Sequence, residues 1–171
     1  MEISQIRKLF GKNRVTKNTI FHELAHAGSL TLLYRVRDNI DEPCSSILQE
    51  VNADGDYSIH VAAKTHRGQL AVRIIQVLLE LGANLNAKDR VWNFTVLHVA
   101  VERDDYVLAK WLRHHPQIDL DARGWDGLTA HETSLITCNK EMMDIFRTDG
   151  VNRAGGTEPK VNESTSNDNQ H

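Results

Sequence analysis

The sequence predicts an all-α stack of about four helix–turn–helix repeats, and three observations support that prediction. A four-residue phrase that ends in histidine recurs, and its histidines stand 38 residues apart both times. A longer helical pattern of apolar residues follows each copy, and the second copy's helix ends in a glycine and a polar turn. Recurrence on this scale is typical of proteins that stack one structural unit. The phrase occupies residues 19–22, 57–60 and 95–98, and a degraded copy occupies residues 129–132.

The segment before the first phrase, residues 1–17, predicts a helix that caps the open end of the stack. Ile3, Ile6 and Leu9 follow helical spacing among basic residues. Such a cap is needed because a terminal unit otherwise exposes the apolar face that its neighbour would cover. In the first unit Gly28 separates two helices, and an irregular stretch over residues 39–52 replaces the polar turn.

The second unit is the most regular. Leu70, Ile74 and Leu78 recur at four-residue spacing, with Ile75 and Leu79 beside them, which predicts a long helix with an apolar face. The third and fourth units repeat this spacing, and the chain then becomes rich in Gly, Ser, Thr and Asn, which predicts a disordered tail. The expected boundaries are residues 18–53, 54–88, 89–124 and 125–150 for the repeats and 151–171 for the tail.

Composition excludes several classes of function. The net charge is −3 and no basic stripe follows the repeats, which argues against a nucleic-acid partner. No apolar run approaches the length of a membrane span, and no secretory signal follows Met1. We therefore expect no nucleic-acid, membrane or small-molecule partner and no cofactor.

One motif suggests an enzyme. Residues 22–26 read HELAH, which matches the pattern in which two histidines hold Zn²⁺ and a glutamate activates water. A third ligand is missing from the usual place, and Glu42 lies in a stretch without helical periodicity. His22 also stands in phase with His60 and His98, which lack the motif. We interpret HELAH as part of a short repeat helix and expect no catalytic or metal-binding residue.

The repeated phrase and the tail Gly82-Ala-Asn-Leu-Asn-Ala resemble the ankyrin repeat, whose phrase is G-x-T-P-L-H-x-A-A and whose tail is G-A-x-x-N-A. The resemblance covers roughly residues 18–150, and Asn93 replaces the leading glycine in the third unit. It implies that His22, His60 and His98 hydrogen-bond the backbone and the phrase threonine, which ties one repeat to the next.

A narrower resemblance rests on IFHELAHAGSL in the first unit, on the lengthened loop between His60 and Gly68, and on WDGLTAHETS after Arg123-Gly124. These segments look like the viral ankyrin proteins of polydnaviruses (bracoviruses), which are IκB-like. The resemblance implies a non-enzymatic inhibitor of host Rel/NF-κB proteins that suppresses immune signalling in the host-cell cytoplasm, with the nucleus as a second location. No Asp-Ser-Gly degradation signal precedes Asn18, so we expect the protein to escape signal-dependent removal. A generic ankyrin adaptor that binds another host protein is the alternative.

The turns between units are the candidate contact region, because in ankyrin stacks they project as fingers. Trp92, Phe94 and Trp125 lie there, either as core residues or as exposed anchors for a partner. Residues 38–63 hold six acidic residues and no Lys or Arg, which forms either solvated surface or a negative rim. The expected partner-binding residues are Asp54, Asp56, Tyr57, Arg90, Trp92, Asn93, Phe94, Trp125 and Asp126.

Overall fold

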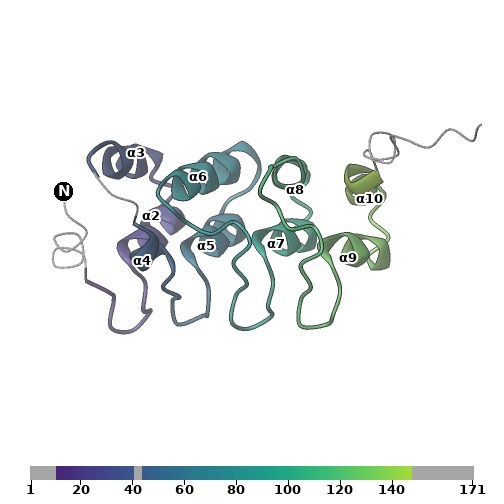
Figure 1. Cartoon of the computed structure of the whole chain (residues 1–171), viewed down its shortest axis with the longest axis horizontal. Coiled ribbons are helices and arrows are strands. Elements are labelled where there is room, and N and C mark those ends of the chain that lie inside the picture. Colours follow the sequence, from purple (N-terminus) through teal and green to yellow (C-terminus); the bar gives the residue numbers. More distant parts are fainter. Residues whose placement is uncertain (1–10, 41–43, 148–171) are drawn as a thin grey trace, which may run out of the picture.

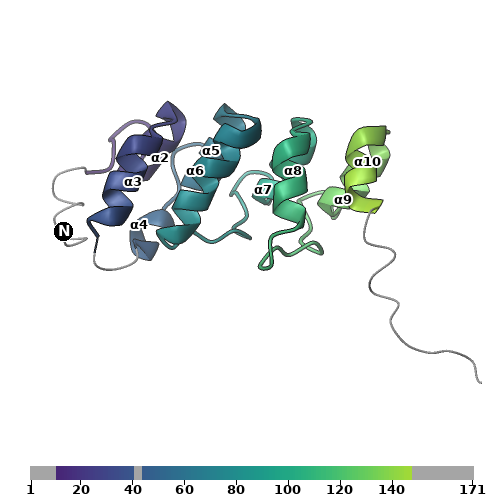
Figure 2. The same ribbon diagram turned by 90° about the horizontal axis from the view of Figure 1, so that it is seen from above.

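The computed structural model describes residues 11–40 and 44–147, and it confirms the predicted all-α stack. The helices form two rows, with α2, α5, α7 and α9 in the row beside the projecting turns and α3, α6, α8 and α10 behind them (Figure 1). Seen from above, the rear helices lie side by side along the stack (Figure 2). The helices of the described residues are α2 (Ile20–Ala27), α3 (Leu30–Asp38), α4 (Ser45–Leu48), α5 (Ser58–Thr65), α6 (Gly68–Glu80), α7 (Val96–Glu102), α8 (Tyr106–Arg113), α9 (Ala130–Ile136) and α10 (Lys140–Arg147).

One turn, here called a finger, projects in front of each unit. A backbone hydrogen bond from the first to the last residue closes each finger, as between Asp89 N and Phe94 O at 2.9 Å. A further backbone bond joins each finger to the next, as between Trp125 N and Trp92 O at 2.8 Å. The first and third fingers have six residues and the second and fourth have five. The fingers are residues 13–18, 52–56, 89–94 and 124–128.

A left-handed residue bends each finger near its end. Gly55 and Gly127 adopt φ angles of 79° and 78° in the five-residue fingers. Lys17 and Asn93 adopt φ angles of 57° and 52° at the same place in the six-residue fingers. Asparagine tolerates this conformation better than most residues with a side chain. The replacement of the leading glycine by Asn93 therefore preserves the backbone turn.

The core runs continuously through the stack, because each unit buries an apolar face against both neighbours. Phe21 and Leu33 fill it in the first unit, and Ile59 and Ile74 in the second. The small residues that follow the phrase, such as Ala62, are fully buried where α5 meets its neighbours. None of the described helices has the length and apolar content that crossing a bilayer requires.

The structure corrects the prediction for both ends of the first unit. Residues 11–17 form no helix, because the side chain of Asn13 accepts hydrogen bonds from the amides of Val15 and Thr16 and bends the chain into a finger. Residues 1–10 and the predicted tail, 151–171, lie outside the described residues. The stretch predicted to be irregular contains the one-turn helix α4, and the amide of Cys44 just before it donates to Leu81 O at 2.8 Å.

Candidate interaction surface

Three buried histidines join the bases of the second, third and fourth fingers to the unit that precedes each. Nε2 of His22 lies 2.8 Å from the carbonyl oxygen of Asp56, which is the last residue of the second finger. His60 and His98 make the same contact with Phe94 O at 2.9 Å and Leu128 O at 3.2 Å. Because a carbonyl oxygen only accepts, Nε2 of each ring donates the proton. Burial lowers the pKa of all three histidines, so the fold holds them neutral.

The other ring nitrogen distinguishes the second unit from its neighbours. In the first and third units, the hydroxyl of Thr19 or Thr95 lies 2.8 Å from Nδ1 of the repeat histidine and donates to it. The second unit has Tyr57 in place of the threonine, and the tyrosine ring lies 5.8 Å from the ring of His60. Nδ1 of His60 consequently has no hydrogen-bond partner among the described residues.

The fourth unit carries Glu132 where the others carry histidine. Its carboxylate accepts from the amide of Thr129 at 2.8 Å and pairs with Arg123 at 2.9 Å. The hydrogen bond from the Thr129 backbone is the main reason that the pKa of Glu132 is lowered. No further finger follows within residues 44–147. The fourth unit therefore has no following finger carbonyl there to which a histidine Nε2 could donate. Glutamate therefore caps α9 without the bond that links the earlier units.

The HELAH segment lies in α2 and has no geometry for zinc. His22 is fully buried, and its two ring nitrogens are engaged by Asp56 and Thr19. Glu23 and His26 are exposed, and Glu23 accepts from the side-chain Nδ2 of Asn18 at 2.9 Å. The described residues contain no cluster of three His, Cys, Asp or Glu side chains that could hold a metal ion. Within this motif, His22 therefore makes the same junction contact as His60 and His98.

The tips of the third and fourth fingers carry paired, exposed tryptophans. Trp92 is 47% exposed and Trp125 is 61% exposed, and their ring centroids lie 5.5 Å apart. Val91 beside them is 55% exposed. Of the two possibilities that the sequence left open, the structure thus favours exposed rings that pack against each other. Val91 was not predicted as a contact residue, although its place in the six-residue finger puts it at the tip.

Two of the predicted contact residues are buried, which corrects their assignment. Phe94 is 6% exposed because its ring stacks on His98 at 5.2 Å, with the two rings nearly parallel. A Cβ atom at Gly124 would come within 2.6 Å of the Phe94 ring, so the next finger packs closely over it. Asp56 is 5% exposed and accepts from Lys64 at 2.6 Å. Both side chains support the stack, and Tyr57 is half-buried against His60.

The remaining predicted residues are exposed. Together with Val91, they form what we call the finger-tip surface: Asp54, Arg90, Val91, Trp92, Asn93, Trp125 and Asp126.

The acidic run is largely compensated by cations from the same chain. Asp38 pairs with Arg37 at 2.8 Å, and Glu50 pairs with Lys12 at 3.3 Å. Asp56 pairs with Lys64, which leaves Asp54 as the acidic residue of the run on the finger-tip surface. Two of its members, Asp41 and Glu42, lie outside the described residues. The described part of the run is therefore a weaker negative rim than the sequence suggests.

Comparison with known proteins places the chain in a family. The family model for the ankyrin repeat matches residues 54–90, which include the second unit. I-kappa-B like protein N2 of Microplitis demolitor bracovirus is 36% identical over 154 residues, covering 87% of this chain and 84% of the relative. Proteins N3 and N1 of the same virus are 35% and 33% identical, covering 77% and 72% of this chain and 80% and 88% of the relatives. The chain therefore belongs to the bracovirus I-kappa-B-like family of ankyrin-repeat proteins.

Proposed function

We propose that this protein is an IκB-like inhibitor that binds host Rel/NF-κB dimers through its finger-tip surface. By binding the Rel protein, it suppresses transcription of host immune genes. The binding takes place in the host-cell cytoplasm and also in the nucleus. Membership of an ankyrin-repeat family supports a role in binding another protein rather than in catalysis. The names of the relatives point to the class of partner that IκB binds. The proposal needs only a rigid surface and no catalytic group.

The exposed pair of Trp92 and Trp125 is the observation that carries this proposal. Tryptophan is enriched among residues that dominate protein–protein binding energy, because one side chain removes a large area from water. Both rings stand on fingers that are joined by a backbone hydrogen bond and rooted in buried histidines. Little conformational freedom is then lost on binding, which favours affinity.

The charge of the surface predicts how binding responds to salt. Arg90 is cationic, Asp54 and Asp126 are anionic, and the rest of the finger-tip surface is neutral. A stable complex needs roughly 800 Å² on each partner, which the tips and the adjoining front helices together can present. Because the charges are mixed, we expect apolar burial to dominate affinity and salt to affect mainly the association rate.

Direct binding of the purified protein to an insect Rel-homology-region dimer tests the proposal. We expect sub-micromolar affinity by interferometry, with only a modest loss between low and physiological salt. Failure to bind several such dimers would contradict the proposal. The alternative adaptor role predicts instead that affinity purification from insect cells recovers a different host protein, whose binding depends on the same tryptophans.

A further inference from the structure

The third finger is held from within by the carboxylate of Asp89. Oδ1 of Asp89 accepts hydrogen bonds from the amide of Val91 at 3.1 Å and from the amide of Trp92 at 2.6 Å. Hydrogen bonds to an ionised oxygen are shorter and stronger than neutral ones. Asp89 therefore sets the backbone conformation of the residues that present the Trp92 ring.

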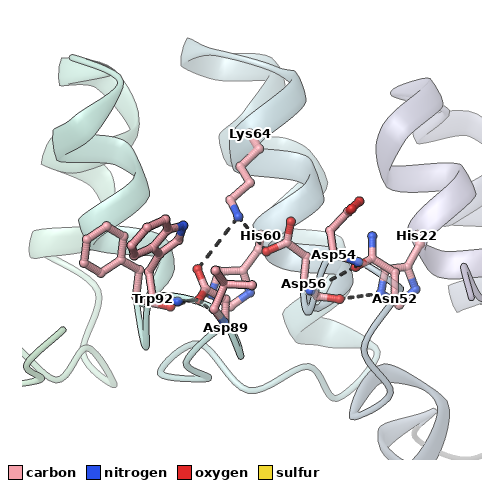
Figure 3. A network of polar contacts seen from close by, with 10 residues as sticks. His22, Asn52, Asp54, Asp56, His60, Lys64, Asp89 and Trp92 are labelled. Carbon is pink, nitrogen blue, oxygen red and sulfur yellow. Dashed lines mark hydrogen bonds and ion pairs between the residues drawn. The ribbon is translucent and has the colours of Figure 1, made fainter. Parts of the chain in front are cut away.

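The other oxygen of this carboxylate is buried beside a lysine of the preceding unit. Asp89 is 1% exposed, and its Oδ2 has no hydrogen-bond partner among the described residues. Nζ of Lys64, on α5, lies 3.8 Å from Oδ2 and 2.6 Å from Oδ1 of Asp56 (Figure 3). A buried carboxylate is costly unless a cation compensates it. Lys64 supplies that cation to both fingers.

The first and second fingers achieve the same turn without charge. In the first finger, the neutral side chain of Asn13 accepts from the amides of Val15 and Thr16. In the second, Asn52 accepts from two amides in the same way. The turn therefore does not require an ionised cap at its first residue, although Lys64 also pairs with Asp56 at the end of the second finger. Among the first three fingers, only the one that carries Trp92 is capped at its first residue by a carboxylate.

We propose that Lys64 is a positioning residue for partner binding: it compensates the buried Asp89 carboxylate, which in turn holds the third finger so that Trp92 faces the partner. Lys64 does not need to contact the partner for this role. The inference rests on the proposed function of the finger-tip surface. It adds a residue on α5 that controls how this surface is presented.

Amide hydrogen exchange in the full-length protein tests the structural half of the inference. In Lys64→Met, which keeps the aliphatic stem, we expect exchange at Val91 and Trp92 to rise by about tenfold. Val15 and Thr16 in the first finger serve as an internal control and should be unchanged. Lys64→Arg should restore slow exchange because it restores the charge. Lys110→Met, which removes an exposed lysine from α8, is the matched control variant.

A double substitution separates positioning from a general loss of stability. In Lys64→Met with Asp89→Asn, the neutral amide oxygen repeats the arrangement of the first finger, so exchange at Val91 and Trp92 should return toward the wild-type rate. If the double variant instead shows the sum of the changes in exchange that the two single substitutions cause, Lys64 and Asp89 act independently and the inference is wrong. Equal acceleration at Val15 and Thr16 in Lys64→Met would also overturn it, because Lys64 would then support the whole stack.

Binding completes the test. Lys64→Met should weaken binding to the Rel-homology-region dimer about fivefold, and the double substitution should recover most of that loss. If exchange changes as expected but the wild-type protein binds no Rel dimer, the proposed function fails while Lys64 still positions the finger. If the wild-type protein binds and Lys64→Met binds equally well, the inference fails and the proposed function stands.

Discussion

The base and the tip of the fingers differ in how far their residues repeat from one unit to the next. At the base, His22, His60 and His98 repeat one buried contact with the carbonyl that ends the following finger. At the tip, the six-residue fingers carry valine with threonine in the first and valine with tryptophan in the third, and the five-residue fingers carry alanine with aspartate in the second and tryptophan with aspartate in the fourth. Repetition at the base maintains the stack, and variation at the tip offers each unit a different contact. The two layers should therefore respond differently to substitution.

The largest expected effect is on the base. His98→Ala removes the bond to Leu128 O, the bond to Thr95 and the ring that stacks on Phe94. We expect the free energy of unfolding, measured in urea by circular dichroism, to fall by about 3 kcal/mol. His26→Ala is the control, since His26 is exposed on α2 and should change stability by less than about 0.5 kcal/mol. A similar loss of unfolding free energy in both variants would show that the buried histidine junctions contribute no more to stability than an exposed histidine does.

A smaller loss should follow when the threonine hydroxyl alone is removed. Thr95→Val keeps the shape of the side chain but takes the donor from His98 Nδ1 and the N-terminal cap from α7. We expect a loss of about 1.5 kcal/mol in the same urea titration. The backbone amide of residue 95 can still donate to Nδ1 of His98, as it does at 3.3 Å in the wild-type protein, so the loss should stay well below that of His98→Ala. An unchanged midpoint would mean that the hydroxyl is not part of the junction.

The junctions should also make stability depend on pH. Burial lowers the pKa of His22, His60 and His98, so below about pH 6.5 the unfolded chain binds protons that the folded chain does not. Stability is therefore complete above that pH and falls as the solution becomes more acidic, by at most about 1.4 kcal/mol per pH unit for each histidine. Burial raises the pKa of Glu102, which works in the opposite direction and softens the loss.

Urea titrations at pH 7.5, 6.5 and 5.5 measure this dependence. All three pH values lie above the ordinary pKa of glutamate. His98→Ala should reduce the slope, whereas His26→Ala should leave it unchanged. Stability that stays constant or rises over this range would contradict neutral, buried histidines.

Much of the base could be predicted from the sequence, because a buried contact imposes the same residue at the same interval. The spacing of His22, His60 and His98 and the small residues after them predict the stack. The finger tips could not be predicted in the same way. Trp92 and Phe94 are aromatic residues of one turn, yet the left-handed Asn93 between them helps direct one ring outward and the other onto His98.

Side-chain pairing also lay beyond the sequence. The run from Asp38 to Asp56 is acidic in sequence, but Lys12 and Lys64 reach it from other elements, and Arg37 pairs with the neighbouring Asp38. The first finger was missed because the helix predicted from Ile3, Ile6 and Leu9 was extended to residue 17, across the turn that Asn13 forms. The location in the host cell and the escape from signal-dependent removal stay predictions.

The affinity of a double tip variant for the Rel-homology-region dimer is the most direct test. Trp92→Ala with Trp125→Ala should weaken binding by at least about 30-fold, since tryptophan anchors commonly contribute 2 kcal/mol or more. Leu70→Ala, which trims an exposed side chain from α6, should bind like the wild-type protein. The double variant should also unfold in urea near the wild-type midpoint. Wild-type affinity in a folded double variant would show that the partner binds elsewhere and that the tips are not the contact surface.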